Sequence, residues 1–211
     1  MKKKDVKKII DSEYKKDLQK LEFVQKGNRF IKKSINSIYE FSYVIYDYGN
    51  VFTPEFSYGI SLLSYNSLIS LIMEQELSPF AYYVRQGTLY EMGIYSVDDY
   101  LITSEDEVFE MTKEVMTFFH QKGLPFLESI TDIKKLDNFI NQRVETPSDG
   151  VKNLIIAKLS DNPNYEYLKK KYREIFKAQN WSIKEDIVNF EKVCSFLDPY
   201  DSEDLNRIIK K

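Results

Sequence analysis

The sequence predicts an α+β protein in which an antiparallel sheet of about four to five strands packs against an N-terminal helix and a C-terminal helical half. Three observations support this fold class. Apolar residues recur every three or four positions up to residue 25, every second position between residues 39 and 62, and every three or four positions again after residue 103. Because helical and strand patterns are segregated along the chain, an antiparallel sheet is expected rather than alternating βαβ units.

The first element is an amphipathic helix over about residues 5–25. Its apolar stripe consists of Val6, Ile10, Tyr14, Leu18 and Leu21. The charged remainder of the helix is expected to face water. Gly27 and Asn28 are typical of a helix end, so we expect the chain to leave the helix there.

The strands follow from residue 29 onward. Phe30 and its neighbours predict a first strand, and Asn36 with Ser37 predicts a turn. The second strand has Tyr39, Phe41, Tyr43 and Ile45 on one face and Val44 and Tyr46 on the other. Residues 47–50 are rich in turn formers, and a third strand is predicted through residues 52–62.

The third strand contains a proline, and two more elements are predicted between it and residue 103. Pro54 indicates an edge strand, a bulge or a late start, because proline cannot donate to a sheet ladder. Residues 66–76 have helical spacing and predict a short helix that crosses to the next strand. Residues 80–90 predict that strand, with Gly87 as a bulge or turn.

After residue 103 the chain is predicted to be helical. Ser104 followed by Glu107 forms a capping box, in which each side chain satisfies a free backbone N–H of the other residue. This helix is expected to stop at Gly123-Leu124-Pro125. Further helices are predicted at 133–144, 154–159, 165–175 and 187–197, with a short one after Asp201.

The predicted organisation is a single domain over residues 1–211, with a helix-plus-sheet half at 1–103 and a helical half at 104–211. One cysteine and one histidine limit the chemistry. Cys194 is expected to be a buried thiol, and it excludes a disulfide within the chain and a cysteine-based zinc site. His120 is expected on the surface near a helix C-terminus. The chain shows no signal peptide and no apolar run long enough to span a bilayer, so a reducing cytoplasm is the expected location.

The charges are distributed unevenly, although the net charge is only −3. Residues 1–33 hold 12 Lys or Arg against 5 acids, whereas residues 91–110 hold seven acids and no base. Such blocks are usually solvated faces, but they also attract partners of opposite sign. Between residues 38 and 84 there is no Lys or Arg, which argues against a nucleic-acid platform on the aromatic strands.

The candidate binding residues in and near the acidic block are Arg85, Asp98, Asp99, Glu105 and Asp106. Hard cations prefer oxygen ligands, but the spacing of these acids matches no calcium loop and Glu107 already has a capping role. No metal site, cofactor or catalytic residue is therefore predicted. Arg85 is expected to pair with Glu55 or Asp98, and anion binding is the alternative.

The tyrosine-rich segment at residues 39–65 is predicted to be mainly core sheet, because the helical stripes need a surface to cover. Tyr46 and Tyr48 point away from Phe41 and Tyr43. If part of this segment binds a ligand, we expect it to be this second face. No basic residue accompanies it, so the ligand is not expected to be a nucleic acid.

Several segments carry a family resemblance: LEFVQKGNRFIKK, FSYGISL, PFAYYVR and SEDEVFEMTKEVMTFFHQKGLPFLESI. With these segments the chain resembles the bacterial DUF 4304 family of unknown function over about residues 5–160. The sharpest matches are Gly27-Asn28-Arg29-Phe30 and Leu124-Pro125-Phe126-Leu127. The chain departs from the family at Glu22, where Gly is usual, and it lacks a His that often precedes the arginine-containing strand. The resemblance implies the fold and a bacterial origin, and it assigns no catalytic residue.

Two classes of function are consistent with these observations. The first is a non-enzymatic protein-interaction module, one form of which is an immunity-type protein that neutralises a cationic toxin through an acidic surface. The alternative is a carboxylate-based or metal-dependent enzyme with a site near Asp98, Asp99 and Arg85. A third and weaker hypothesis is a small-ligand binder that uses the tyrosine-rich face. The sequence leaves the oligomeric state open.

Overall fold

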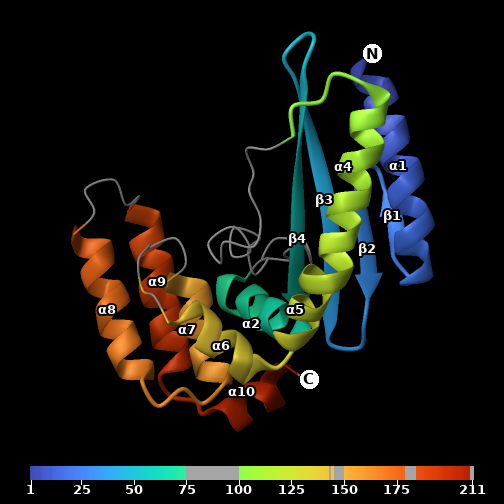
Figure 1. Ribbon diagram of the computed structural model, residues 1–211. Coiled ribbons are helices and arrows are strands. Elements are labelled where there is room, and N and C mark those ends of the chain that lie inside the picture. Colours follow the sequence, from blue (N-terminus) through green and yellow to red (C-terminus); the bar gives the residue numbers. More distant parts are fainter. Residues whose placement is uncertain (75–99, 143, 145–149, 179–183, 210–211) are drawn as a thin grey trace. The chain divides into compact units, whose positions relative to one another are not determined.

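The computed structural model describes residues 1–74, 100–142, 144, 150–178 and 184–209 and confirms the α+β fold class (Figure 1). An N-terminal helix precedes a four-stranded antiparallel sheet, and the C-terminal half is mostly helical. The chain divides into two compact units. Unit 1 holds residues 1–61 and 100–128 of the described chain, and unit 2 holds the rest of it.

Unit 1 combines the sheet with two long helices. Its elements are α1 (Lys3–Lys20), β1 (Val24–Lys26), β2 (Arg29–Lys33), β3 (Ser37–Asp47), β4 (Phe52–Leu62), α4 (Glu105–Phe118), the π-helical turn η2 (Phe119–Gly123) and α5 (Leu124–Ser129). The strand order is β1-β2-β3-β4, so each strand pairs with its neighbour in the chain. Phe30 lies opposite Phe41 in the β2–β3 register. Pro54 lies on β4, the last strand in this order among the described residues.

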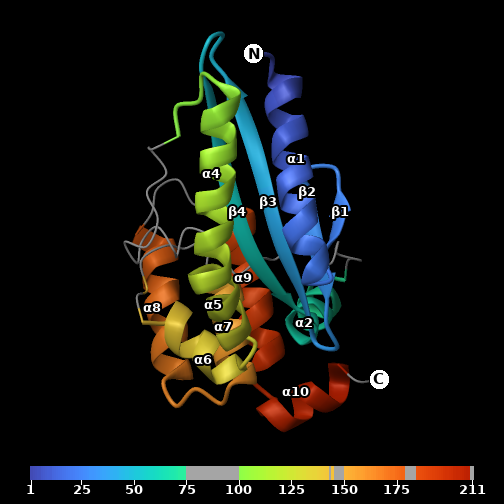
Figure 2. The same cartoon turned by 45° about the vertical axis from the view of Figure 1, so that its right-hand side comes forward.

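Helices α1 and α4 lie side by side and cover one face of the sheet (Figures 1 and 2). The core between these helices and the sheet is a cluster of aromatic rings, many of them in edge-to-face contact. The ring centroid of Phe41 lies 5.0 Å from that of Tyr14 on α1 and 5.3 Å from that of Phe119 on η2. The predicted core face of β3 is confirmed, because Tyr39, Phe41, Tyr43 and Ile45 are all buried.

The prediction that the first helix extends to about residue 25 was wrong, because α1 ends at Lys20. Glu22 adopts a left-handed conformation with φ of 66°, and the N–H of Phe23 donates back to the carbonyl of Leu18 (3.0 Å). This is the hydrogen-bond pattern of a helix-ending Schellman motif. It places Phe23 in the core, where its ring lies 6.0 Å from Phe119.

Gly27 and Asn28 do not end the helix as predicted but turn the hairpin from β1 to β2. Lys26 pairs with Arg29 across this two-residue loop, and Gly27 has φ of 68°, which glycine adopts without strain. Asn28 also donates from its side-chain amide to the backbone carbonyl of Tyr43 (2.5 Å). The described sheet thus reaches four strands because of β1, a short strand that the sequence did not predict. The strand predicted at 80–90 lies outside the described residues.

The prediction that the next helix stops at Gly123-Leu124-Pro125 was also wrong, because the backbone stays helical through η2 into α5. The N–H of Leu124 donates to the carbonyl of Phe119, one residue further back than in an α-helix. This shift places Pro125 in the first turn of α5, where proline is tolerated. A Cβ on Gly123 would lie 3.0 Å from a ring carbon of Phe119, so glycine allows the wide turn to pack tightly.

Unit 2 is helical. Its elements are α2 (Leu63–Met73), α6 (Ile133–Ile140), α7 (Gly150–Leu159), α8 (Tyr165–Ala178), α9 (Lys184–Leu197) and α10 (Ser202–Ile209). Helix α7 packs against α6, α8 and α9, while α2 contacts α7, α9 and α10. Helix α6 ends at Ile140, short of the predicted residue 144. In the described ranges no helix is both long and apolar enough to cross a membrane.

Candidate functional site

The β3–β4 hairpin ends in a short turn that carries Tyr48. Asp47 Oδ1 accepts a hydrogen bond from the N–H of Gly49 (2.9 Å), and the N–H of Tyr48 donates to the carbonyl of Val51 (3.0 Å). Gly49 has φ of 87°, a conformation that favours glycine. These bonds hold the turn and leave the side chain of Tyr48 71% exposed.

The second face of the hairpin, which the sequence places opposite Phe41 and Tyr43, is exposed next to this turn. Val44 and Tyr46 both project from β3 on the face opposite the aromatic core. The hydroxyl of Tyr46 donates to Glu55 Oε2 (3.2 Å) on β4. The neighbouring Glu55 carboxylate raises the pKa of Tyr46, so this hydroxyl remains a neutral donor. Tyr46 therefore presents an aromatic ring whose position is fixed by a cross-strand bond.

A backbone bridge brings the start of α4 to the same end of unit 1 as the hairpin turn (Figure 1). Phe52 and Ile102 exchange two N–H to carbonyl bonds, both of 2.9 Å. Leu101 is 67% exposed beside this bridge, and Glu105 begins α4 three residues after it. We define the hairpin-end surface as Tyr48, Leu101, Glu105 and Asp106, which lie at this end of unit 1. Val44 and Tyr46 lie on the sheet face opposite the one that α4 covers.

The acidic side chains at this end differ in whether they have hydrogen-bond or ion-pair partners within the chain. Glu107 accepts hydrogen bonds from the N–H groups of Thr103 (2.6 Å) and Ser104 (3.0 Å), and the bond from Thr103 is the main cause of its lowered pKa. This confirms the predicted capping box. Glu105 and Asp106 are exposed and form no ion pair within the part of the chain that the structure describes. Their charge is available to a partner.

Helices α1 and α4 carry opposite charge on neighbouring outer faces of unit 1. Helix α1 has seven lysines against four acids, and α4 has five acids against one lysine. Several α1 lysines pair within their own helix, for example Lys7 with Asp11 (2.6 Å) and Lys16 with Glu13 (2.6 Å). The basic N-terminal block is thus partly balanced internally, whereas the acids at the start of α4 are not.

A polar cluster that sequence reasoning missed lies where α1 meets β1 and β3. Asp11 accepts hydrogen bonds from Lys7 (2.6 Å), from Gln25 (2.8 Å) and from the hydroxyl of Tyr43. Burial, reinforced by Asp11, raises the pKa of Tyr43. The only sequence feature that could have indicated this cluster is Tyr43, a residue with a polar hydroxyl on the buried face of β3. Because every charge in this cluster is balanced, it fastens the helix to the sheet and we assign it a structural role.

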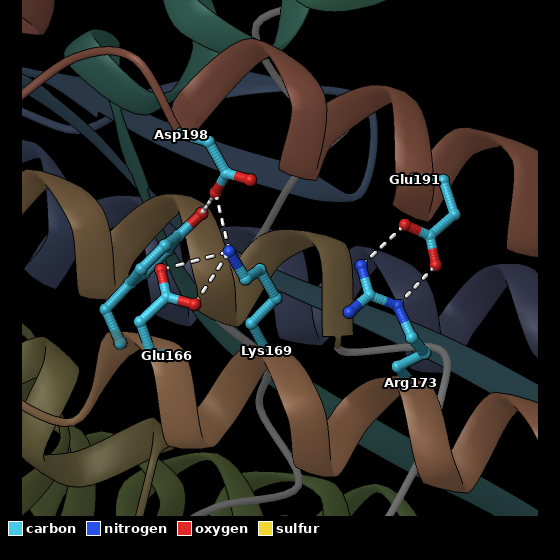
Figure 3. A network of polar contacts seen from close by, with 6 residues as sticks. Glu166, Lys169, Arg173, Glu191 and Asp198 are labelled. Atoms are coloured by element: carbon cyan, nitrogen blue, oxygen red, sulfur yellow. Dashed lines mark hydrogen bonds and ion pairs between the residues drawn. The ribbon is translucent and has the colours of Figure 1, made fainter.

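A second charged network joins α8 to α9 (Figure 3). Lys169 donates to Glu166 on its own helix (3.0 Å) and to Asp198 just after α9 (2.8 Å). Arg173 and Glu191 form a bidentate pair with N–O distances of 2.6 Å and 2.7 Å. Each group has an oppositely charged partner, so the network holds two helices together rather than forming a reactive site.

Replacing Glu191 by glutamine is expected to remove an acid-sensitive contribution to stability. Hydrogen bonds from Arg173 lower the pKa of Glu191 below its ordinary value of 4.5. A lowered pKa stabilises the folded state above the unfolded pKa, and this contribution is lost as the pH falls through the folded pKa, below 4.5. Because both side chains are partly exposed, we expect a loss of less than about 1 kcal/mol near neutral pH. Urea unfolding followed by circular dichroism at neutral and strongly acidic pH measures the difference; an equal loss at both would contradict it.

The remaining predicted residues have clear positions or lie outside the described residues. Cys194 is buried in α9, and burial raises the pKa of its thiol to about 12, so the thiol is not a nucleophile. His120 is partly exposed in η2, with Nε2 3.9 Å from Asp17 Oδ2. Arg85, Asp98 and Asp99 fall outside the described residues. Among those described, no group of three or more His, Cys, Asp or Glu side chains is arranged to hold a metal ion.

Comparisons of the chain with family models, curated proteins and solved structures find no match. The resemblance to the DUF 4304 family therefore stays a prediction.

Proposed function

We propose that the protein is a non-enzymatic interaction module that binds a cationic protein through the hairpin-end surface. One observation carries this proposal: exposed Tyr48 and Leu101 lie at the same end of unit 1 as Glu105 and Asp106, which have no positive partner in the described chain. Aromatic and apolar side chains supply contact area, and the acids attract a positive partner and discriminate against others.

An immunity-type neutraliser of a cationic toxin is the form of this function that we favour. Its support is the high density of acids on α4, together with a sequence pI of about 5.4. We place the protein in a reducing cytoplasm, which is consistent with the buried free thiol of Cys194. The enzyme alternative depends on Arg85, Asp98 and Asp99 and stays a prediction.

The test compares the protein with the triple variant Tyr48→Ala, Glu105→Gln, Asp106→Asn. Partners are captured by chemical crosslinking on the immobilised protein, identified by mass spectrometry, and purified for titration calorimetry. We expect a basic partner whose affinity falls at least about tenfold in the variant, because an aromatic anchor and two steering charges are lost. The affinity is also expected to fall as salt is raised.

A matched control is Glu185→Gln, Asp186→Asn, which removes two exposed acids from the first turn of α9 in unit 2. This variant has the same loss of helix N-terminal charge but leaves the hairpin-end surface intact. We expect it to bind the partner as the wild type does. Equal loss in both variants would show that the interaction depends on net charge alone, and the proposed surface would be wrong.

A further inference from the structure

Unit 2 contains a polar depression of about 410 Å³ between α6 and the loop from α7 to α8. Five amide side chains line it: Asn138, Asn141, Gln142, Asn162 and Asn164. Asp137 and Ser160 are its buried members, and Lys134 and Asp161 are exposed at its rim. The volume lies in the range of small-molecule sites. All of these residues belong to unit 2, so the depression is separate from the hairpin-end surface.

The carboxylate of Asp137 is buried at 3% exposure and has only neutral hydrogen-bond donors as partners. Its Oδ1 accepts from Asn141 Nδ2 (2.6 Å), and its Oδ2 accepts from Ser160 Oγ (2.8 Å) and Asn162 Nδ2 (2.7 Å). Buried charges are usually paired with an opposite charge or a metal. Lys134 lines the same depression but forms no ion pair with Asp137 in the described chain. A carboxylate has about four lone-pair sites, so one acceptor position is still open.

The rim of the depression has free donors and acceptors of its own. The side-chain amides of Asn138, Gln142 and Asn164 make no hydrogen bond among the described residues. The loop that carries Asn164 is nevertheless held in place, because its backbone N–H donates to Asn162 Oδ1 (2.8 Å). Each free amide offers two donors and one acceptor. A fixed loop and a fixed helix therefore present solvent-accessible donors and acceptors to one space.

We propose that this depression binds a neutral, polyhydroxylated small molecule of about monosaccharide size. A hydroxyl group donates to a carboxylate or amide oxygen and accepts from an amide NH₂, so several hydroxyls match this mixed lining. Anions are disfavoured, because two carboxylates but only one ammonium group line the depression. An apolar ligand is disfavoured, because it would leave the amide groups at the rim and the buried carboxylate without new hydrogen-bond partners.

The hydrogen bonds of Asp137 alone would be explained by a structural role, because they tie the loop at Ser160 and Asn162 to α6. The side chains of Asn138 and Gln142 also line the depression but take no part in those bonds. These two side chains therefore separate the two interpretations. Replacing them leaves the hydrogen bonds of Asp137 intact and removes two amide groups that a ligand in the depression would contact.

The test is a titration of the isotope-labelled protein with glucose, galactose, ribose and myo-inositol, followed by NMR. We expect at least one of these polyols to saturate shifts confined to residues that line the depression. The double variant Asn138→Ala, Gln142→Ala is expected to bind about tenfold more weakly, the effect of roughly two lost hydrogen bonds. Lys135→Ala, an exposed position on α6 outside the depression, is the matched control and should bind as the wild type does.

Three results would overturn the proposal. The first is that none of the four polyols gives saturable shifts. The second is that the double variant binds the polyol as tightly as the wild type. The third is that methylguanidinium, added as a cationic probe, saturates the site while no polyol does, which would make the depression a cation site. None of these results bears on the hairpin-end surface, because that surface lies in unit 1.

Discussion

Replacing Phe41 by alanine is expected to lower the free energy of unfolding of unit 1 by about 3–5 kcal/mol, the usual cost of deleting a fully buried ring. Phe41 is 0% exposed at the centre of the aromatic core. Its ring centroid lies 5.0 Å from that of Tyr14 and 5.2 Å from that of Tyr58. These rings come from α1 and β4, so the cavity cannot close by moving one element alone. Urea unfolding combined with hydrogen exchange of the strand amides measures the effect.

Phe109→Ala is the matched control for this measurement. Phe109 is also a phenylalanine of unit 1, but it lies on the outer face of α4 and is 46% exposed. We expect its loss to change stability by less than about 1 kcal/mol, because most surface substitutions have small effects. A similar loss for both variants would mean that the aromatic cluster is not the core of this unit.

Replacing Asp137 by alanine is expected to cost about 2–3 kcal/mol in unit 2, since buried donors would lose their acceptor. Ser160 is buried and donates to Asp137 Oδ2 (2.8 Å), and Asn162 donates to the same oxygen (2.7 Å). Ser160 has one alternative acceptor, the carbonyl of Ala157 at 3.0 Å, which keeps the cost below that of a wholly unsatisfied network. Unfolding in urea followed by circular dichroism gives the value.

Two further variants define what Asp137 contributes. Asp137→Asn keeps the shape of the side chain and one acceptor oxygen, but it turns an NH₂ group toward other donors. We therefore expect its free energy of unfolding to lie between those of the wild type and Asp137→Ala. Asn138→Ala alters the next residue of α6, which is exposed, and should leave stability within about 0.5 kcal/mol. If alanine at position 137 were as stable as the wild type, the buried carboxylate would not hold the loop to α6.

Structural features that depend only on residues close together in the sequence were predictable. The stripe from Val6 to Leu18 is buried as expected, and Ser104 and Glu107 cap α4. The alternation along β3 correctly separated Phe41 from the exposed Val44. These features follow from helical and strand periodicity and from short-range hydrogen bonds, which the order of residues specifies directly.

The error at the first helix occurred where a distant contact outweighed a local preference. Gly27 and Asn28 are good helix-ending residues, but leaving the helix at Lys20 places Phe23 against the ring of Phe119, almost a hundred residues away. The helical path through Gly123 has a local cause, because glycine lets the wide turn pack against the ring of Phe119 in the same turn.

The candidate site was predictable in part. Tyr48, Glu105 and Asp106 were each singled out from their local patterns, but nothing in the sequence indicated that they share one end of unit 1. The bridge between Phe52 and Ile102 joins residues fifty positions apart and produces that arrangement. The depression around Asp137 was missed, because its amides come from two segments with no motif in common.

By itself, the sequence determined the α+β class, the core face of the sheet and most helices, because these depend on periodicity within single segments. Only the tertiary structure decided that α4 covers the sheet beside α1, although the sequence grouped it with the helical half, and that α2 belongs to unit 2. An apolar stripe specifies that a helix must be covered but not which surface covers it. In unit 1 that choice is made by ring packing and by the backbone bridge between Phe52 and Ile102, whereas side-chain hydrogen bonds of Asp137 shape the depression in unit 2.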